Sequence, residues 1–410
     1  MTPYEITAYR AGPCTPTVGR MSSLQHPPTL PRRRPDVAGR PAPLSALARP
    51  RDVFAYLGPN WFASVMGTGI VATAAAGLPV HLPGLRFAAT LVWAAAALLL
   101  VALVAAWAVH LRRHRDTAFG YAADPVMAQF WGAPPMALMT VGGGALLLGG
   151  AWIGESAAVT VDLVLWSLGT GLGLLTAVAI PYLMMTRHRI GPDAAFGGWL
   201  MPVVPPMVSA ANGALLVPHL PAGEARLDMV IACYAMFGIS LAATLIILPQ
   251  LWSRLVVHRV GAARMVPTLW IVLGPLGQSI TAAHLLGRAA DGVLPDPYAA
   301  GAQLLALLYG VPVMGFALLW LALAAAITVR TARAGLPFSL TWWSFTFPVG
   351  TLVTGVTGMA DRSGSAMLTA LAVLLYGLLL AAWATVAART VRDAWHGHLF
   401  LPPAVAARSA

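Results

Sequence analysis

The chain consists of long apolar runs separated by short polar segments. A helix needs roughly 20 apolar residues to cross the hydrocarbon core of a bilayer. Ten runs of about this length occur, at residues 61–78, 87–110, 126–150, 159–184, 199–217, 229–252, 267–287, 299–328, 341–360 and 366–388. Asp162 is the one Asp, Glu, Lys or Arg inside them. Because a charge at mid-bilayer costs a few kcal/mol, this pattern predicts an all-α integral membrane protein with ten transmembrane helices.

Composition supports a membrane protein and excludes several other classes. Apolar residues make up 58% of the chain and charged residues 10%, against roughly 45–50% and 25% in soluble domains. The two cysteines, Cys14 and Cys233, are too few for a disulfide framework or a cysteine metal cluster. The sequence contains no metal-ligand spacing, phosphate-binding loop or nucleophile with an acid–base partner. We therefore expect no enzymatic activity, metal or cofactor.

The basic residues predict the orientation of the chain. All 25 are Arg and the net charge is +11, which by itself is compatible with a nucleic-acid partner. When the loops are assigned alternately to two sides, 21 Arg fall on the side of both termini and four on the other: Arg86, Arg226, Arg288 and Arg362. Cytoplasmic loops carry such an excess, so we expect both termini in the cytoplasm, a multi-pass protein of the cell (plasma) membrane, and no nucleic acid. Attraction of cytoplasmic anions to a pore mouth is a second interpretation of the same Arg.

The ends of the chain differ from its apolar part. Residues 1–55 are rich in Pro and Arg and contain no apolar run long enough for a signal peptide. We expect a disordered cytoplasmic tail there, in which Met21 is as good a translation start as Met1. Residues 56–395 are then the ten-helix transmembrane transporter or channel domain, and 396–410 a cytoplasmic C-terminal tail.

Helix-breaking residues concentrate in alternate runs. The odd-numbered runs hold 8 Pro and 16 Gly, and the even-numbered ones 3 Pro and 8 Gly. Broken helices expose backbone groups, which a membrane tolerates only inside protein or facing a water-filled cavity. The pattern predicts five helical hairpins around a central pore formed by the odd-numbered helices. Close helix packing is the alternative explanation for any single Gly or Pro.

Polar residues on the odd-numbered helices fall on common faces at helical spacing. The predicted lining residues are Ser64, Thr68, Gly69, Pro205, Ser209, Asn212, Gly274, Gln278, Thr281, Thr351 and Thr354. Small neutral hydroxyl and amide groups partly replace an ion's hydration without holding the ion tightly. This favours a channel or facilitated carrier for small anions.

Two other functions stay open. In a proton-coupled secondary transporter of a dicarboxylate or sulfite, His284 or Asp124 would titrate. The plainer interpretation is a hydrogen-bonded interfacial His284 and a helix-capping Asp124, with Asp162 as a boundary or interface residue. A membrane scaffold or receptor without transport is the third class. The anion itself is not identified by a neutral lining.

Three segments resemble one transporter family. They are Trp61–Ile70, Gly274–Gln278 and Trp342–Gly350, and they are similar to the tellurite-resistance/dicarboxylate transporter family of malate permeases, sulfite efflux pumps and plant slow anion channels. The resemblance covers about residues 55–395. It implies a homotrimer in the bilayer, with one pore in each protomer and a gating phenylalanine in the ninth run. Phe347 matches that phenylalanine best, and Phe345 is the alternative register.

Overall fold

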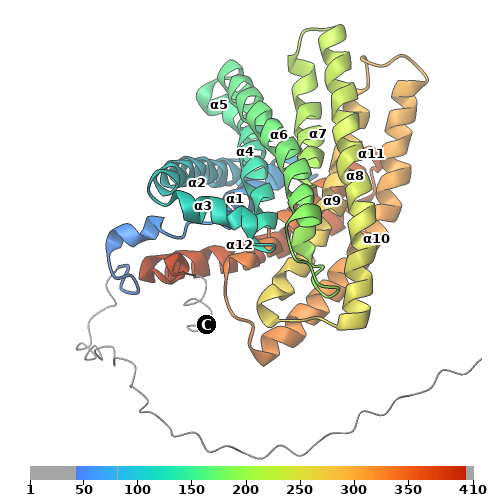
Figure 1. The fold of residues 1–410 in the computed structure, drawn as a ribbon. Helices are drawn as coiled ribbons and strands as arrows, with labels where there is room; N and C mark the ends of the chain where they lie inside the picture. The colour runs from blue at the N-terminus through green and yellow to red at the C-terminus, as the bar shows by residue number, and fades with distance from the viewer. Residues whose placement is uncertain (1–42, 81, 403–410) are drawn as a thin grey trace, which may run out of the picture. The chain divides into compact units, whose positions relative to one another are not determined.

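A computed structural model describes residues 43–80 and 82–402 of the chain (Figure 1). Every regular element in this described part is helical. Apart from the short helices α3 (Arg115–Ala123) and α5 (Gly150–Ile153), the α-helices are of two kinds, long continuous ones and shorter ones that follow 3₁₀ turns. The two kinds alternate along the chain, as the distribution of Gly and Pro predicts.

The five long helices have few buried residues. They are α2 (Leu85–Arg113), α6 (Glu155–Thr186), α8 (Glu224–His258), α10 (Tyr298–Gly335) and α12 (Ala366–His396). Only 28% to 33% of their most apolar windows is buried inside the protein. Large apolar side chains such as Leu98 and Leu374 point outward instead. A helix that is apolar on its exposed side is typical of a membrane span that faces lipid.

The shorter helices follow 3₁₀ segments. These pairs are η2 (Pro59–Trp61) with α1 (Phe62–Gly77), η3 (Met127–Gly132) with α4 (Ala133–Gly144), η5 (Gly197–Leu200) before α7 (Pro205–Leu216), η7 (Ala263–Val272) with α9 (Leu273–Ala289), and η8 (Leu340–Phe345) before α11 (Phe347–Ser363). Prolines stand in the first turn of α4, α7 and α11. Proline is favoured there because its fixed φ suits the helix and its missing N–H would have no intrahelical partner.

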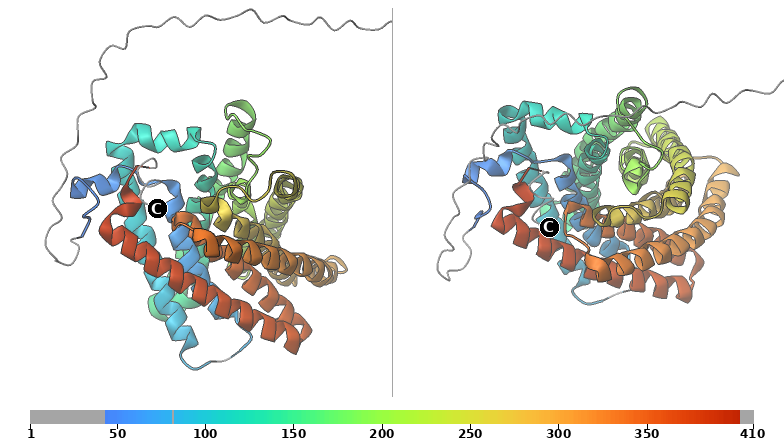
Figure 2. Two further views of the ribbon diagram at one scale, coloured as in Figure 1. Left: turned by 90° about the horizontal axis from the view of Figure 1, so that it is seen from below. Right: turned by 60° about the horizontal axis from the view of Figure 1, so that its bottom comes forward.

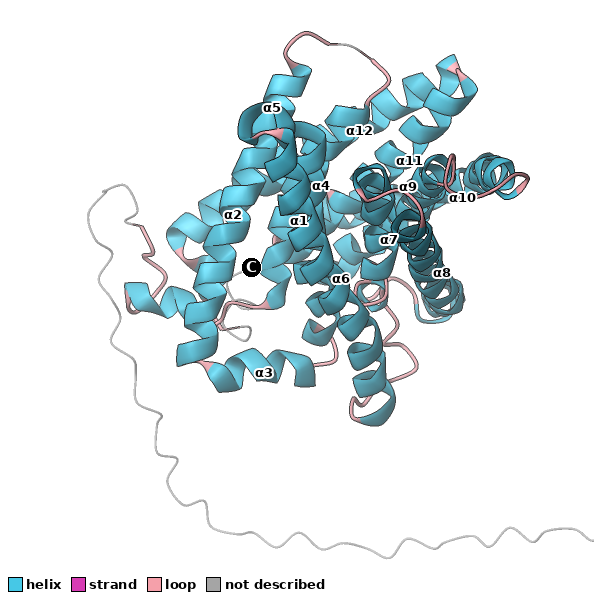
Figure 3. Cartoon of the chain, turned by 90° about the horizontal axis from the view of Figure 1, so that it is seen from above, coloured by secondary structure: helices cyan, strands magenta, loops and turns pink. Residues whose placement is uncertain are grey.

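The shorter helices contact one another in a closed sequence. α1 packs against α4, α4 against α7, α7 against α9, α9 against α11, and α11 against α1 again. Each long helix packs on the shorter helix that precedes it in the chain. Figure 3 shows the shorter helices between the long ones, and Figure 2 gives two further views of this arrangement. Gly277 permits the close approach of α9 and α11, because a Cβ there would collide with the backbone of Leu352.

The structure supports the membrane assignment. Fewer helices than the ten predicted are long and apolar enough to be clear membrane spans. Seven elements in the described residues are long and apolar enough to cross a membrane: the five long helices, Met127–Ile153 and Ala263–Ala289. The other three predicted spans correspond to α1, α7 and α11, which have 16, 12 and 17 residues. Helices this short are at or below the length of a single span. Ten spans therefore remain a prediction.

The ends of the described part are packed onto the helices. The backbone N–H of Leu44 donates to the carbonyl oxygen of Trp395 over 2.7 Å, and η1 (Pro50–Phe54) follows. Near the other end, the ring of Phe400 stacks on Trp61 with 5.1 Å between ring centroids. Residues 43–55 and 396–402 thus belong to the folded unit, which begins earlier and ends later than predicted. The remaining residues of both expected tails lie outside the described part.

Candidate functional site

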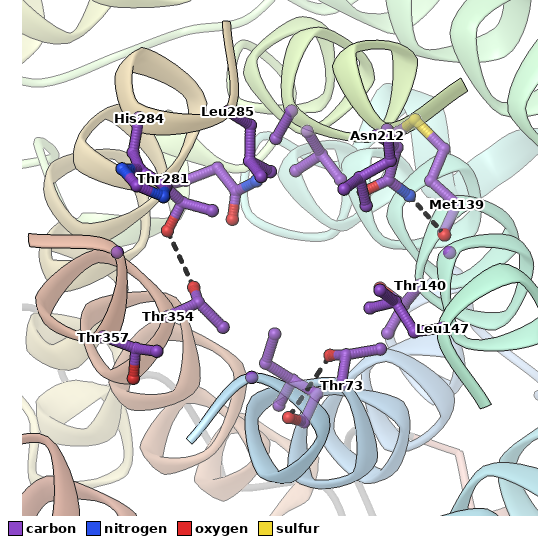
Figure 4. A pocket seen from close by; sticks show the side chains of 18 of the residues that line it. Thr73, Met139, Thr140, Leu147, Asn212, Thr281, His284, Leu285, Thr354 and Thr357 are labelled. Atoms are coloured by element: carbon purple, nitrogen blue, oxygen red, sulfur yellow. Dashed lines mark hydrogen bonds between the residues drawn. The ribbon is translucent and has the colours of Figure 1, made fainter. Parts of the chain in front are cut away.

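A cavity of about 220 Å³ lies between the five shorter helices. Side chains from α1, α4, α7, α9 and α11 all reach it, and so does Leu147 of η4 (Ala145–Gly149), a π-helical turn that continues α4 (Figure 4). On α11 the lining extends from Phe347 to Asp361. That step of 14 residues corresponds to a helical rise of about 21 Å. The cavity therefore extends along the helices, and its two ends differ chemically.

Uncharged polar groups occupy the middle of the cavity. Asn212 of α7, Gln278 and Thr281 of α9, and Thr354 of α11 line it. The hydroxyls of Thr281 and Thr354 are hydrogen-bonded at 2.7 Å, which joins α9 to α11 across the wall (Figure 4). The Asn212 amide donates to the carbonyl oxygen of Met139 and so joins α7 to α4. The Gln278 side chain has no hydrogen bond to any described residue, which leaves its amide for a bound molecule.

Charged groups lie at one end. Arg288 and Asp361 line the cavity there, one turn beyond His284 and Gly358. The imidazole of His284 is buried against Gly358, where a Cβ would lie 2.6 Å from its ring. The neighbouring Arg362 donates to the Gln303 side chain over 3.0 Å. Arg288 therefore presents a cation to the cavity, and Asp361 places one carboxylate at the same end.

Phe347 lies at the opposite end. It begins α11 beside Pro348, and its ring is 3% exposed and lines the cavity. Phe345 has a different environment, because its ring packs edge-on against Trp270 and Trp342 with centroid distances of 5.1 and 5.6 Å. Of the two registers considered for a gate, only Phe347 reaches the cavity.

The wall that α4 contributes combines three successive glycines with an irregular helical turn. Gly142–Gly144 precede the π-turn η4, a feature that often marks functional sites. The indole of Trp93 donates to the carbonyl oxygen of Val141 over 3.0 Å, and Arg86 donates to that of Leu147 over 2.8 Å. Side chains of α2 thus hold this irregular wall from behind.

The predicted residues divide into two groups. Asn212, Gln278, Thr281, Thr354, His284 and Phe347 lie together around the cavity. The others do not line it: Ser64, Thr68, Gly69, Pro205, Ser209, Gly274 and Thr351. Most of these lie at contacts between helices. For example, the Thr68 hydroxyl accepts from the Trp383 indole over 3.2 Å, and Ser209 contacts Met139.

Asp124 lies at neither end of the cavity. Its carboxylate accepts from the backbone N–H groups of Val126 and Met127 at 2.8 and 2.7 Å, at the start of η3. This is a helix-capping arrangement. Among the described residues, no group of three or more His, Cys, Asp or Glu is placed to hold a metal ion.

Sequence reasoning missed several lining residues, including the two charged ones. Arg288 and Asp361 fall just beyond the apolar runs that end at residues 287 and 360. The signal was nevertheless present, because Arg288 is four residues after His284 and continues the face of Gln278 and Thr281. On α1 the lining residues Ile70, Thr73 and Gly77 lie nearer the C-terminal end of the helix than the predicted ones. Thr140 and Thr357 were also missed.

Comparisons with known proteins agree with one another. Residues 56–391 match a family model described as SLAC1, voltage-dependent anion channel. The chain is 26% identical over 357 residues to a sulfite efflux pump of Trichophyton rubrum, covering 83% of this chain and 92% of the pump. It is 26% identical over 359 residues to an uncharacterized transporter of Methanocaldococcus jannaschii, covering 87% and 99%. A sulfite efflux pump of Candida albicans is 24% identical over 324 residues, covering 73% and 66%.

Proposed function

Because the chain belongs to the voltage-dependent anion channel family, we propose that it carries small anions across a membrane through the cavity between α1, α4, α7, α9 and α11. In this proposal ten helices form five hairpins, and the cavity is part of a continuous path. Sulfite is the first anion to test, since several of the similar proteins are sulfite efflux pumps. Four-carbon dicarboxylates are the second. A transport role also agrees with the expectation that the chain is not an enzyme.

One observation carries this proposal: the cavity has neutral donors in its middle and Arg288 at one end. The amides of Asn212 and Gln278 can donate to an anion's oxygens, and Arg288 attracts negative charge toward the entrance. Neutral groups bind an anion weakly enough for it to leave again, which transport requires. A carboxylate in the middle of the cavity would oppose entry, and the one lining carboxylate, Asp361, lies at the end beside Arg288.

Phe347 is the proposed gate. Its ring closes the end of the cavity opposite Arg288, beside a proline that fixes the start of α11. An aromatic ring across a narrow passage blocks ions by occupying the space and by excluding water. Movement of this ring, rather than of a whole helix, would then open the path.

The orientation of the path follows from the distribution of Arg. If both termini are cytoplasmic, Phe347 lies toward the cytoplasm and Arg288 toward the outside. We place the protein in the plasma membrane in this orientation, as a homotrimer with one path in each protomer. The apolar outer faces of the long helices are compatible with both lipid and neighbouring protomers.

Proton-coupled transport is the alternative function. It is favoured by His284, the one histidine among the residues that line the cavity, because an imidazole is a common proton carrier in proteins. Asp124, the other residue considered for this role, caps η3 outside the cavity. It therefore adds no support for proton-coupled transport.

Flux through purified protein in liposomes tests both functions. Sulfite, malate, chloride and nitrate would each be loaded inside, with an ionophore that sets the membrane potential. We expect flux driven by the anion gradient alone, and tenfold or greater loss of it in Arg288→Gln if that cation recruits the anion. Gln303→Ala is the matched control, because Gln303 contacts Arg362 rather than the cavity. Absence of flux for all four anions would refute the proposal.

A further inference from the structure

Asp162 is a buried carboxyl that the proposed transport path does not use. It lies on α6, seven residues after the helix begins at Glu155, which places it about 10 Å along the helix axis. Its side chain is 0% exposed. Neither carboxylate oxygen has a hydrogen-bond partner among the described residues.

The surroundings of Asp162 offer it no compensating charge. The elements that pack most extensively against α6 are α4, η4, α7, η3 and α5 (Gly150–Ile153), and none of them contains an Asp, Glu, His, Lys or Arg. On α6 itself the only other charged residue is Glu155, another acid. Arg86 of α2, the cation that contacts η4, is exposed and is engaged with the carbonyl oxygen of Leu147.

We propose that Asp162 is a proton-binding site whose carboxyl is protonated at neutral pH, and that loss of this proton lowers anion flux. An isolated ionised carboxylate in an apolar interior is so unfavourable that the group takes up a proton instead. The first half of the proposal depends only on the position of Asp162. The second half rests on the proposed transport function.

The path from Asp162 to the cavity crosses one helix. Its oxygen Oδ1 faces Gly142 of α4, where a Cβ would lie 2.6 Å away. The next residue, Gly143, lines the cavity, and a Cβ there would lie 2.9 Å from the amide nitrogen of Asn212. A carboxylate here would be about 10 Å from a passing anion, one helix diameter. At an effective dielectric constant near 20 the repulsion lowers anion occupancy by about tenfold.

A carboxylate would also disturb the wall itself. It would draw water or backbone N–H groups toward it, and Gly142 of α4 packs directly against its oxygen Oδ1. Both effects, repulsion and disturbance of α4, reduce flux when the proton is lost. The site therefore makes flux depend on pH itself, without a proton being carried across the membrane.

Infrared spectroscopy of the full-length protein in lipid tests the first half. We expect the carbonyl stretch of a protonated carboxylic acid at neutral pH in the unmodified protein. This band should be absent from Asp162→Asn and from Asp162→Leu, and retained in Asp228→Asn. Asp228 is the matched control, because it lies near the start of the next long helix, α8, but is exposed. Asp162 is replaced in two different ways so that a folding defect in one variant does not decide the result. If no such band is lost on replacing Asp162, the proton site is refuted.

Anion flux at equal pH on both sides of the membrane tests the second half. We expect flux of the unmodified protein and of Asp228→Asn to fall about tenfold as alkaline pH removes the infrared band, and flux of Asp162→Asn to stay level. A band that does not titrate, or a flux that does not follow it, refutes control by this proton. If no anion is transported at any pH, the proposed function fails while the infrared result still decides whether Asp162 binds a proton.

Discussion

Truncation of Phe347 to alanine separates a gate from an ordinary core residue. The ring is almost fully buried, yet one side of it borders the cavity of about 220 Å³. Space left by the missing ring would therefore join an existing water-accessible volume instead of forming a closed void. The matched comparison is Phe130 of η3, which is 4% exposed and belongs to the hydrophobic core away from the cavity.

The two truncations should differ in their effect on the free energy of unfolding. Loss of a buried phenylalanine in a closed core costs about 3–5 kcal/mol. This cost has two parts that add: a transfer term, the lost free energy of moving the ring out of water, and a cavity term, the cost of the void that is left. For Phe347→Ala we expect only the transfer term, about 1.5–3 kcal/mol. Removal of the occluding ring should at the same time raise anion flux at least tenfold, which corresponds to about 1.4 kcal/mol off the barrier.

Flux in liposomes and stability in detergent should be measured on the same preparations. We expect Phe347→Ala to be the more permeable and the less destabilised of the two variants. Phe345→Ala tests the register: its ring makes two aromatic pairs, each worth about 0.5–1.5 kcal/mol, so it should lose stability without gaining flux. Destabilisation of Phe347→Ala as large as that of Phe130→Ala, with flux unchanged, would show that the ring is packing and not a gate.

Three further predictions concern topology, coupling and packing. In a background without the native cysteines, Ser156→Cys should react with an impermeant thiol reagent added outside, and Ala334→Cys only after permeabilisation; the reverse would invert the predicted orientation. Anion flux should persist after the pH gradient is collapsed, and His284→Gln should retain most of it, whereas strict dependence on a proton gradient that this variant abolishes would favour the coupled alternative. Gly132→Ala should be destabilised by several kcal/mol, because its Cβ would collide with the backbone carbonyl of Met201. The control Gly171→Ala, whose Cβ would meet nothing within 4 Å, should change stability by no more than about 1 kcal/mol. Equal losses of stability of the two variants in a thermal melt would contradict the packing.

Hydropathy and Pro/Gly content were sufficient to predict the membrane class and the alternation of two kinds of helix. Both depend on transfer of whole segments into lipid, which sequence composition reports directly. Span length was less predictable. The run predicted at 199–217 begins within the 3₁₀ turn η5, and the α-helix that follows, α7, has only 12 residues. Local hydrogen bonding decides that division, and hydropathy does not report it.

The site was predictable where one helix face carried several polar residues. Gln278, Thr281 and His284 share such a face and all reach the cavity. On α1 the choice of Thr68 failed to identify a lining residue, because its hydroxyl is bound by the indole of Trp383, 315 residues away. A partner so distant in sequence leaves no local signal. The buried surroundings of Asp162 were unpredictable for the same reason.

The closed sequence of helix contacts has a consequence for synthesis of the protein. α1 lies between α4 and α11, and it is also held by α12, whose Tyr376 hydroxyl donates to the Val71 carbonyl oxygen over 3.4 Å. α1 is the first of the described α-helices to be made, and it meets α2 and α4 early, but it meets α11 and α12 only when nearly the whole chain has been made. Until then the polar side of α1 faces lipid, other unfinished helices or a membrane-insertion factor. A nascent chain arrested before residue 347 would lack Phe347, the proposed gate, and the whole α11 wall, so the cavity is completed only late in translation.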